Sequence, residues 1–352
     1  MTLTKAVVLA QPPTAASALH RDRVGLPPAP LLSVANRSLL EHALGWLAKA
    51  GVRDTAVIVP QELAGQTRAA AHAPAGLELN WLEQLPGETV GDALGELTGF
   101  LGGEPFVLHL ADSLARQGLR SLTSRAPGNE LAALLVLDES RSANGADVID
   151  LHPGPAHPAI RSAHRGGAGV ALIGGRAIEA MGALDAPPDQ LLERLMARIE
   201  DDGGLVRTRC VRDWWRFRGG PEALLEGNRF ALEGLRADYN EGQLVDSTIQ
   251  GAVVVHPDAL IESSVVRGPA IIGARTRLRE AYVGPYTSIG DDVLIEGAEV
   301  EHSVVFPGAS VRHLSGRLEA SVIGPGARIF RDFRLPRAFR MTVGEGAEVS
   351  LT

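Results

Sequence analysis

The sequence predicts an α/β domain with a mostly parallel sheet, followed by a β-solenoid built from short parallel strands. In the first part of the 352-residue chain, continuous apolar runs alternate with segments of helical periodicity. From about residue 246 onward, aliphatic residues instead recur at every sixth position. Because the period changes there, we place the two domains at residues 1–240 and 241–352.

Strands that are apolar throughout and alternate with helices indicate a sheet covered by helices on both faces. The first strand is expected at residues 5–10. The spacing of apolar residues from Leu39 to Ala48 predicts a helix, and Gly51 is expected to end it. Further strands are expected at residues 55–59, 105–110, 132–137 and 169–173, and further helices at residues 175–181, 188–199 and 221–235.

The six-residue period of the second part fits neither an amphipathic helix nor an ordinary hairpin sheet. It is typical of a β-solenoid, in which each short strand directs one aliphatic side chain into a narrow core before the chain turns a corner. The repeat positions are Ile249, Val255, Ile261, Ile272, Leu278, Val283, Ile289, Ile295, Val305, Val311, Ile323, Ile329, Val343 and Val349.

The favoured interpretation of the solenoid is a structural spacer or an oligomerisation surface. The alternative is a second active site of the acyltransferase kind, which in such solenoids needs a histidine base. His256, His302 and His313 are the candidates, and the sequence singles out none of them.

Composition excludes several classes of protein and ligand. The chain is 45% hydrophobic, which is enough for two cores, and its single cysteine, Cys210, forms no internal disulfide. No apolar run reaches the roughly 18 residues of a membrane span, and the N-terminus lacks the pattern of a signal peptide. The net charge of −8 without a basic block argues against nucleic acid and anionic membranes. We therefore expect a cytoplasmic protein.

Several segments resemble a known family. Residues 219–229, GGPEALLEGNR, resemble its GTPEDLLEANR segment, and residues 35–40, ANRSLL, resemble its ANKPLL segment. Residues 106–113, FVLHLADS, resemble its strand that ends in GDN, and residues 283–291, VGPYTSIGD, resemble its solenoid. The family is that of the sugar-1-phosphate nucleotidylyltransferases, in the long glucose-1-phosphate thymidylyltransferase branch. The resemblance covers nearly the whole chain.

The resemblance implies a Rossmann-like nucleotidyltransferase domain with a mixed, mostly parallel sheet and a C-terminal left-handed β-helix. It also implies a reaction in which a sugar 1-phosphate attacks the α-phosphorus of a nucleoside triphosphate and releases pyrophosphate. Mg²⁺ and basic side chains neutralise the growing charge, and a glycine loop donates backbone N–H groups to the triphosphate.

The first departure from the family lies in residues 7–19, VVLAQPPTAASAL, which align with LAGGxGTRL. Leu9 and Ala10 match, but Gln11 and Pro12 stand where glycines belong, and Ala16 replaces the arginine. Proline has no N–H to donate, and a side chain in place of glycine blocks close approach of the backbone. The segment therefore resembles a phosphate loop without its phosphate-binding features.

Two lysines and a metal ligand are also missing. The family lysines fall on Ala29 and His152, and the only lysines of the chain are Lys5 and Lys49. Asp112 matches the first Mg²⁺ ligand of the family. The second belongs to a W-x-D-x-G segment, which reads WRFRG here, so that Phe217 stands in place of the aspartate.

Some ligand-facing positions remain. Gln84 matches the glutamine that reads the base, Thr89 stands at the first glycine of the GLADAL segment, and Gly169 matches the sugar-side strand. With Leu9, Ala10 and Gln11, these residues are the expected remnant of a nucleotide and sugar pocket.

The combined losses predict a family member with a degenerate active site, which serves as a binding, regulatory or scaffold protein. Its expected partners are a weakly bound nucleotide or nucleotide-sugar, further copies of itself, or an active paralogue. One alternative is an active enzyme with rewired phosphate contacts that uses arginines, Asp112 and Mg²⁺. The other is the β-helix acyltransferase.

Overall fold

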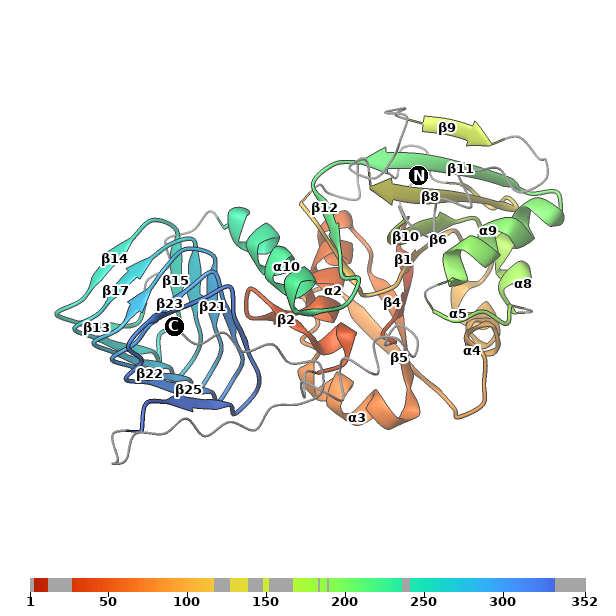
Figure 1. Ribbon diagram of the computed structural model, residues 1–352. Helices are drawn as coiled ribbons and strands as arrows, with labels where there is room; N and C mark the ends of the chain where they lie inside the picture. Colours follow the sequence, from red (N-terminus) through yellow and green to blue (C-terminus); the bar gives the residue numbers. More distant parts are fainter. Residues whose placement is uncertain are drawn as a thin grey trace. The chain divides into compact units, whose positions relative to one another are not determined.

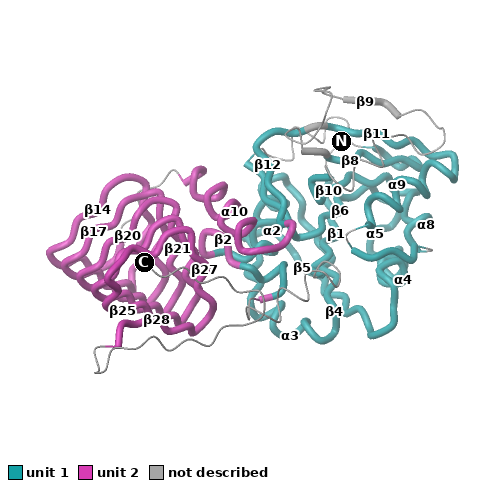
Figure 2. The backbone as a smooth tube through the Cα atoms, viewed as in Figure 1, with its two compact units in different colours: residues 1–15, 28–32, 37–217 teal, residues 16–27, 33–36, 218–352 magenta. Residues whose placement is uncertain are grey.

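A computed structural model describes residues 3–11, 27–116, 127–138, 148–151, 167–182, 184–188, 190–235 and 241–332 (Figure 1). The chain divides into two compact units (Figure 2). Unit 1 comprises residues 1–15, 28–32 and 37–217, and unit 2 comprises residues 16–27, 33–36 and 218–352. The predicted boundary after residue 240 stays a prediction. No helix in the described ranges is both long and apolar enough to span a membrane.

Unit 1 is built on an eight-stranded sheet with the order β5-β4-β1-β6-β10-β8-β11-β9. The strands β5, β4, β1 and β6 are mutually parallel, whereas β10 runs antiparallel to both of its neighbours. The predicted mixed, mostly parallel sheet is thereby confirmed. Its strands are β1 (Lys5–Leu9), β4 (Asp54–Pro60), β5 (Glu78–Gln84), β6 (Phe106–His109), β8 (Ala132–Asp138), β9 (Val148–Leu151), β10 (Gly167–Ile173) and β11 (Leu205–Val211).

Helices cover both faces of this sheet, as the continuous apolar strands predict (Figure 1). Along β1, Val7 and Leu9 enter one core while Ala6 and Val8 enter the other, because successive side chains of a strand point to opposite faces. The first core takes side chains from α4 (Val90–Glu96), α5 (Thr98–Leu101), η3 (Gly175–Ala177), α8 (Ile178–Met181) and α9 (Leu191–Asp201), and the second from α2 (Leu39–Ala50) and α3 (Gln61–Ala70).

The predicted helix after residue 38 is confirmed with both of its ends. Ser38 and Glu41 form a reciprocal capping box at the start of α2, with Glu41 N donating to Ser38 Oγ at 3.1 Å. Gly51 ends the helix in the left-handed region at φ 96°, where glycine is favoured. The helix expected from residue 188 begins later, at Leu191, and the one expected at 175–181 splits into η3 and α8.

Unit 2 contains α10 (Pro221–Glu233) and three parallel sheets that form a β-helix. The sheets have the orders β13-β16-β19-β22-β25-β28, β14-β17-β20-β23-β26 and β15-β18-β21-β24-β27. The strands are β13 (Gln243–Val245), β14 (Thr248–Gln250), β15 (Val253–Val255), β16 (Leu260–Glu262), β17 (Val265–Arg267), β18 (Ala270–Ile272), β19 (Arg277–Arg279), β20 (Tyr282–Val283), β21 (Thr287–Ile289), β22 (Leu294–Glu296), β23 (Glu299–Glu301), β24 (Val304–Val305), β25 (Ser310–Arg312), β26 (Arg317–Glu319), β27 (Val322–Ile323) and β28 (Arg328–Phe330).

The aliphatic residues of the six-residue period form the core of this β-helix. In one sheet, Ile261, Leu278, Ile295 and Val311 pair in succession, and all four side chains are fully buried. Stacking identical positions gives each strand an apolar neighbour above and below, which is what a solenoid core needs. The predicted parallel β-helix is confirmed, whereas its left-handed sense stays a prediction. Val343 and Val349 lie outside the described residues.

A buried asparagine fixes α10 within unit 2. Asn228 Nδ2 donates to Tyr286 O at 3.0 Å, and its Oδ1 accepts from Ser288 Oγ at 2.6 Å and from Ala35 N at 2.9 Å. Since an unpaired buried amide is costly, these bonds explain why an asparagine is tolerated at 0% exposure. Residues 33–36, with β2 (Ser33–Val34), are thereby tied to α10 and the β-helix, while β3 (Arg37–Ser38) begins the next part of unit 1.

Candidate functional site

The candidate site lies at the carboxyl edge of the sheet in unit 1. From β1 the chain adds β4 and β5 on one side and then β6 on the other, which makes β1 and β6 a topological switch point. Ligands of open α/β sheets bind outside the strand ends at such a point. Gln11 and Asp112 follow the carboxyl ends of β1 and β6, and Gln84 is the last residue of β5. Gly169 joins them near the start of the antiparallel β10.

The two glutamines at this edge satisfy each other. Gln11 Nε2 donates a hydrogen bond to Gln84 Oε1, and Gln84 Nε2 donates to Glu88 O at 2.7 Å. Gln11 itself is buried, at 7% exposure. The amide that would read a base in the resembled family therefore has both of its ends engaged within the chain.

Thr89 acts as a helix cap. Its hydroxyl accepts from Asp92 N at 3.1 Å, and Thr89 N donates to Asp92 Oδ2 at 2.9 Å, so the pair forms a capping box at the start of α4. The bond from Thr89 N and, secondarily, the bond that the Thr89 hydroxyl donates to Asp92 Oδ2 at 2.8 Å lower the pKa of Asp92. The residue at the family's glycine position is thus used for local structure.

The remaining loop and lysine positions are apolar where the structure describes them. Leu9 and Ala10 are buried, and Ala10 N continues the sheet by donating to Ile58 O at 2.8 Å. Ala29 is buried in the short helix η1 (Ala29–Leu31), where a lysine would stand in the family. Ala16 and His152 lie outside the described residues.

Asp112 forms an ion pair with an arginine that sequence analysis did not single out. Arg216 Nε donates to Asp112 Oδ2 at 2.7 Å, and Arg216 Nη1 donates to Gly167 O at 3.3 Å. The two side chains are only 13% and 12% exposed. They come from β12 (Trp214–Arg216) and the residue before β7 (Ser113–Ala115), two strands that pair antiparallel. Because the pair is shielded from water, the attraction between its two charges is stronger than in an ion pair on the surface.

Gly169 makes room for this ion pair. It adopts φ 77°, and a Cβ atom at this position would overlap Asp112 Oδ1 and lie 3.3 Å from Arg216 Nε. A side chain would therefore be excluded both by the backbone conformation and by the ion pair. Three of the sequence-derived positions, Asp112, Gly169 and Phe217, meet around Arg216.

Phe217 provides no second ligand for a metal ion. Its amide donates to Asp112 O at 2.7 Å, which fixes it beside Asp112, but its ring is 9% exposed and packs against Trp215. In the described ranges, no group of three or more His, Cys, Asp or Glu side chains is arranged to hold a metal. With the single carboxylate already paired, the residues present do not fit the Mg²⁺ that the family resemblance implies.

His109 is a buried, neutral histidine next to the ion pair. Its Nδ1 accepts from Ala111 N at 2.9 Å, and its ring meets Trp46 edge to face. Burial, and secondarily the positive charge of Arg216, lowers the pKa of His109 to about 3. The imidazole is therefore a structural acceptor and not a general base at neutral pH.

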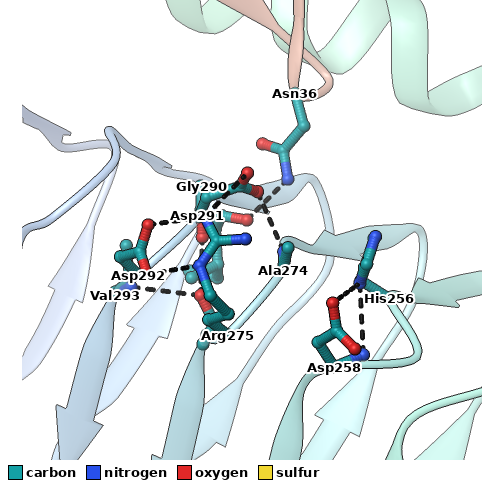
Figure 3. A network of polar contacts seen from close by, with 11 residues as sticks. Asn36, His256, Asp258, Ala274, Arg275, Gly290, Asp291, Asp292 and Val293 are labelled. Atoms are coloured by element: carbon teal, nitrogen blue, oxygen red, sulfur yellow. Dashed lines mark hydrogen bonds and ion pairs between the residues drawn. The ribbon is translucent and has the colours of Figure 1, made fainter.

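The three histidines of the β-helix are exposed or turn residues with local partners. His256 Nδ1 accepts from Asp258 N at 3.2 Å, beside the arginine–aspartate contacts of the neighbouring coils (Figure 3). His302 lies edge to face with Tyr286 at φ 48°, and His313 Nε2 lies 3.8 Å from Glu296 Oε2. None of these contacts supports the acyltransferase alternative.

A chemical signal for Arg216 was present in the sequence. Once Phe217 replaces the second carboxylate, Asp112 needs another positive partner in place of the metal. Arg216 and Arg218 both lie directly beside the position of the lost carboxylate, and either is a candidate for that role. What the sequence lacked was the antiparallel pairing of β7 with β12, which sets Arg216 opposite Ser113.

Comparisons with known proteins find relatives that match this chain over most of its length. A "Glucose-1-phosphate thymidylyltransferase" of Streptomyces griseus is 30% identical over 338 residues, which cover 92% of this chain and 93% of that protein. A protein of the same name from Streptomyces antibioticus is 28% identical over 335 residues, covering 91% and 93%. The "Low-salt glycan biosynthesis nucleotidyltransferase Agl11" of Haloferax volcanii is 29% identical over 343 residues, covering 92% and 94%. No protein-family profile matches the chain.

The shielded ion pair predicts a large cost when only one partner is removed. Asp112→Asn leaves the Arg216 charge uncompensated, and we expect it to lower the free energy of unfolding by about 2–4 kcal/mol. The double variant D112N/R216M removes both charges and is expected to recover part of that loss. Urea denaturation measures all three. The exposed pair Arg229–Glu233 is the control, with a change below about 0.5 kcal/mol for Glu233→Gln. Equal losses for D112N and E233Q would contradict this assignment.

His109 predicts a specific loss of stability in acid. The unfolded chain binds a proton at the histidine near pH 6.5, whereas the folded chain does so only near pH 3, so stability falls as the pH drops between these values. His109→Asn keeps an acceptor for Ala111 N but does not titrate. Between pH 7.5 and 5, the wild-type protein should therefore lose about 2 kcal/mol more than H109N in urea denaturation. His256→Asn, at an exposed site, serves as the control, and parallel pH profiles for wild type and H109N would reject this prediction.

Proposed function

This chain belongs to the family of sugar-1-phosphate nucleotidyltransferases, and we propose that it is a member with an impaired active site. Family members join a sugar 1-phosphate to a nucleoside triphosphate, and the names of the relatives point to glucose 1-phosphate and a thymidine nucleotide. The proposed role is binding of a nucleotide or nucleotide-sugar, with regulation or scaffolding as its outcome. Self-association or an active relative as partner belongs to the same proposal.

The observation that supports impairment is the pairing of Asp112 with Arg216 beside a buried Phe217. Transfer of a nucleotidyl group needs strong stabilisation of charge on the phosphates, and metal ions often supply it. A carboxylate that is neutralised by an arginine, with Phe217 in place of the second carboxylate of the family, is a poor metal ligand. The site thus lacks the electrostatic element on which the reaction depends most.

The remaining losses act in the same direction. No lysine lies between Lys5 and Lys49 and none follows Lys49, so the two lysines of the family have no counterpart. Pro12 and Pro13 remove two amide donors from the segment that corresponds to the phosphate loop. Each missing charge-assisted contact to a phosphate is worth about 1.5–3 kcal/mol, so that several together lower the rate by orders of magnitude.

A pyrophosphate-release assay tests the proposed impairment. Purified protein with dTTP, glucose 1-phosphate and MgCl₂ is expected to release pyrophosphate at least about a thousandfold more slowly than an active relative assayed in parallel. The slow rate follows from the missing cations and amide donors. Release at the rate of the active relative would end the proposal.

The second candidate is an active enzyme with rewired phosphate contacts. Its support is the retention of Gln84, Asp112 and Gly169 at one edge of the sheet, with a guanidinium among them. Calorimetric titration with a panel of nucleoside triphosphates and sugar phosphates distinguishes the candidates. Turnover together with millimolar or tighter binding favours the rewired enzyme. Binding without turnover favours the impaired member, and no heat with any compound rejects both a rewired enzyme and a ligand-binding role.

A further inference from the structure

We propose that Arg216 takes the place of the divalent cation at Asp112, so that this site is organised around a guanidinium and excludes a bound metal ion. The inference rests on the proposed function, because it concerns the same edge of the sheet. It adds a residue with a defined role and a mode of ligand binding that needs no metal.

The geometry of the guanidinium supports this role. Arg216 Nε lies 2.7 Å from Asp112 Oδ2, and Nη1 lies 3.3 Å from Gly167 O, so two of its three nitrogens are anchored in place. Mg²⁺ would have to approach the same carboxylate to about 2.0–2.1 Å and would keep several waters around it. On the side of Asp112 Oδ2, that space is held by an arginine side chain that is 13% exposed.

The charges around Asp112 favour one cation, the guanidinium of Arg216, and disfavour an additional metal ion. Asp112 carries the only acidic side chain for which an ion pair with Arg216 is found among the described residues. Phe217 adds no negative charge where the family has its second carboxylate. A divalent ion beside the fixed guanidinium would be repelled by it, and this repulsion is weakly screened because the pair is shielded from water.

The backbone next to the pair is shaped for it. Gly169 has no side chain in the space where a Cβ would meet both Asp112 and Arg216. The carbonyl of Gly167, two residues earlier on β10, accepts from the guanidinium. Asp112, Gly167 and Gly169 therefore form a cradle that fits a planar, hydrogen-bonding cation.

The third nitrogen of the guanidinium is left for a ligand. Within the described ranges, no protein group accepts a hydrogen bond from Arg216 Nη2. Guanidinium groups bind phosphate oxygens well, because their planar donors match the anion and their charge is permanent. A phosphate-bearing ligand at this edge would thus meet Arg216 directly, with no metal bridge.

The test is binding of Mn²⁺ alone to the full-length protein, followed by electron paramagnetic resonance. Wild-type protein is expected to show no binding that Asp112→Asn removes. Arg216→Met removes the guanidinium from the carboxylate and should raise the affinity for one Mn²⁺ by about tenfold or more. The variant R216M/F217D, which restores the second carboxylate, should bind more tightly still, and D112N in that background should abolish the gain. Arg229→Met removes an exposed arginine and is the matched control, with no change expected.

Three outcomes would overturn the inference. The first is binding of Mn²⁺ to wild-type protein that D112N abolishes. The second is an R216M variant that folds, by circular dichroism, yet gains no Mn²⁺ affinity. The third is an equal gain in R216M and R229M. If R216M does not fold, the inference is still tested by comparing Mn²⁺ binding to the wild-type protein with Mn²⁺ binding to D112N. Since the readout is metal binding and not turnover, failure here is distinct from failure of the pyrophosphate assay.

Discussion

The ion pair between Asp112 and Arg216 determines what the candidate site can do. The two groups are brought together by the pairing of β7 with β12 and are largely withdrawn from water. Removing an aspartate and an arginine from water is costly, and only close contact with good hydrogen bonding offsets that cost. The carboxylate therefore needs its arginine, and a metal ion would have to displace a partner that is already anchored at Gly167 O.

Other polar side chains at this edge of the sheet are likewise hydrogen-bonded within the chain. The side-chain amide of Gln84 is hydrogen-bonded to Gln11 and Glu88, and the hydroxyl of Thr89 accepts a hydrogen bond from the first turn of α4. Polar groups that await a ligand are normally left to water, because each internal bond must be broken before the ligand can use the group. Here several such groups are satisfied within the chain. A nucleotide would compete with these bonds, which is consistent with weak binding.

Much of the fold could be predicted from the sequence because its signals are local and repeated. The six-residue period defined the β-helix core, and the Ser38–Glu41 box and Gly51 marked the ends of α2. The strand β5 was missed because it lies at the sheet edge and carries polar residues, so it lacks a continuous apolar run. Phe217 and Asp112 were recognised from their motifs, but Arg216 was not. Its role depends on a contact between residues far apart in the chain, and no local pattern encodes that contact.

The two relatives at 29% and 30% identity each match more than nine-tenths of the chain. The cores of both units are apolar and buried. The decisive measurement is an anomalous difference map from crystals grown with dTTP and MnCl₂. We predict no manganese peak within about 2.6 Å of Asp112 and an intact Asp112–Arg216 contact. A manganese ion bound to Asp112, with Arg216 turned away, would contradict this description of the site.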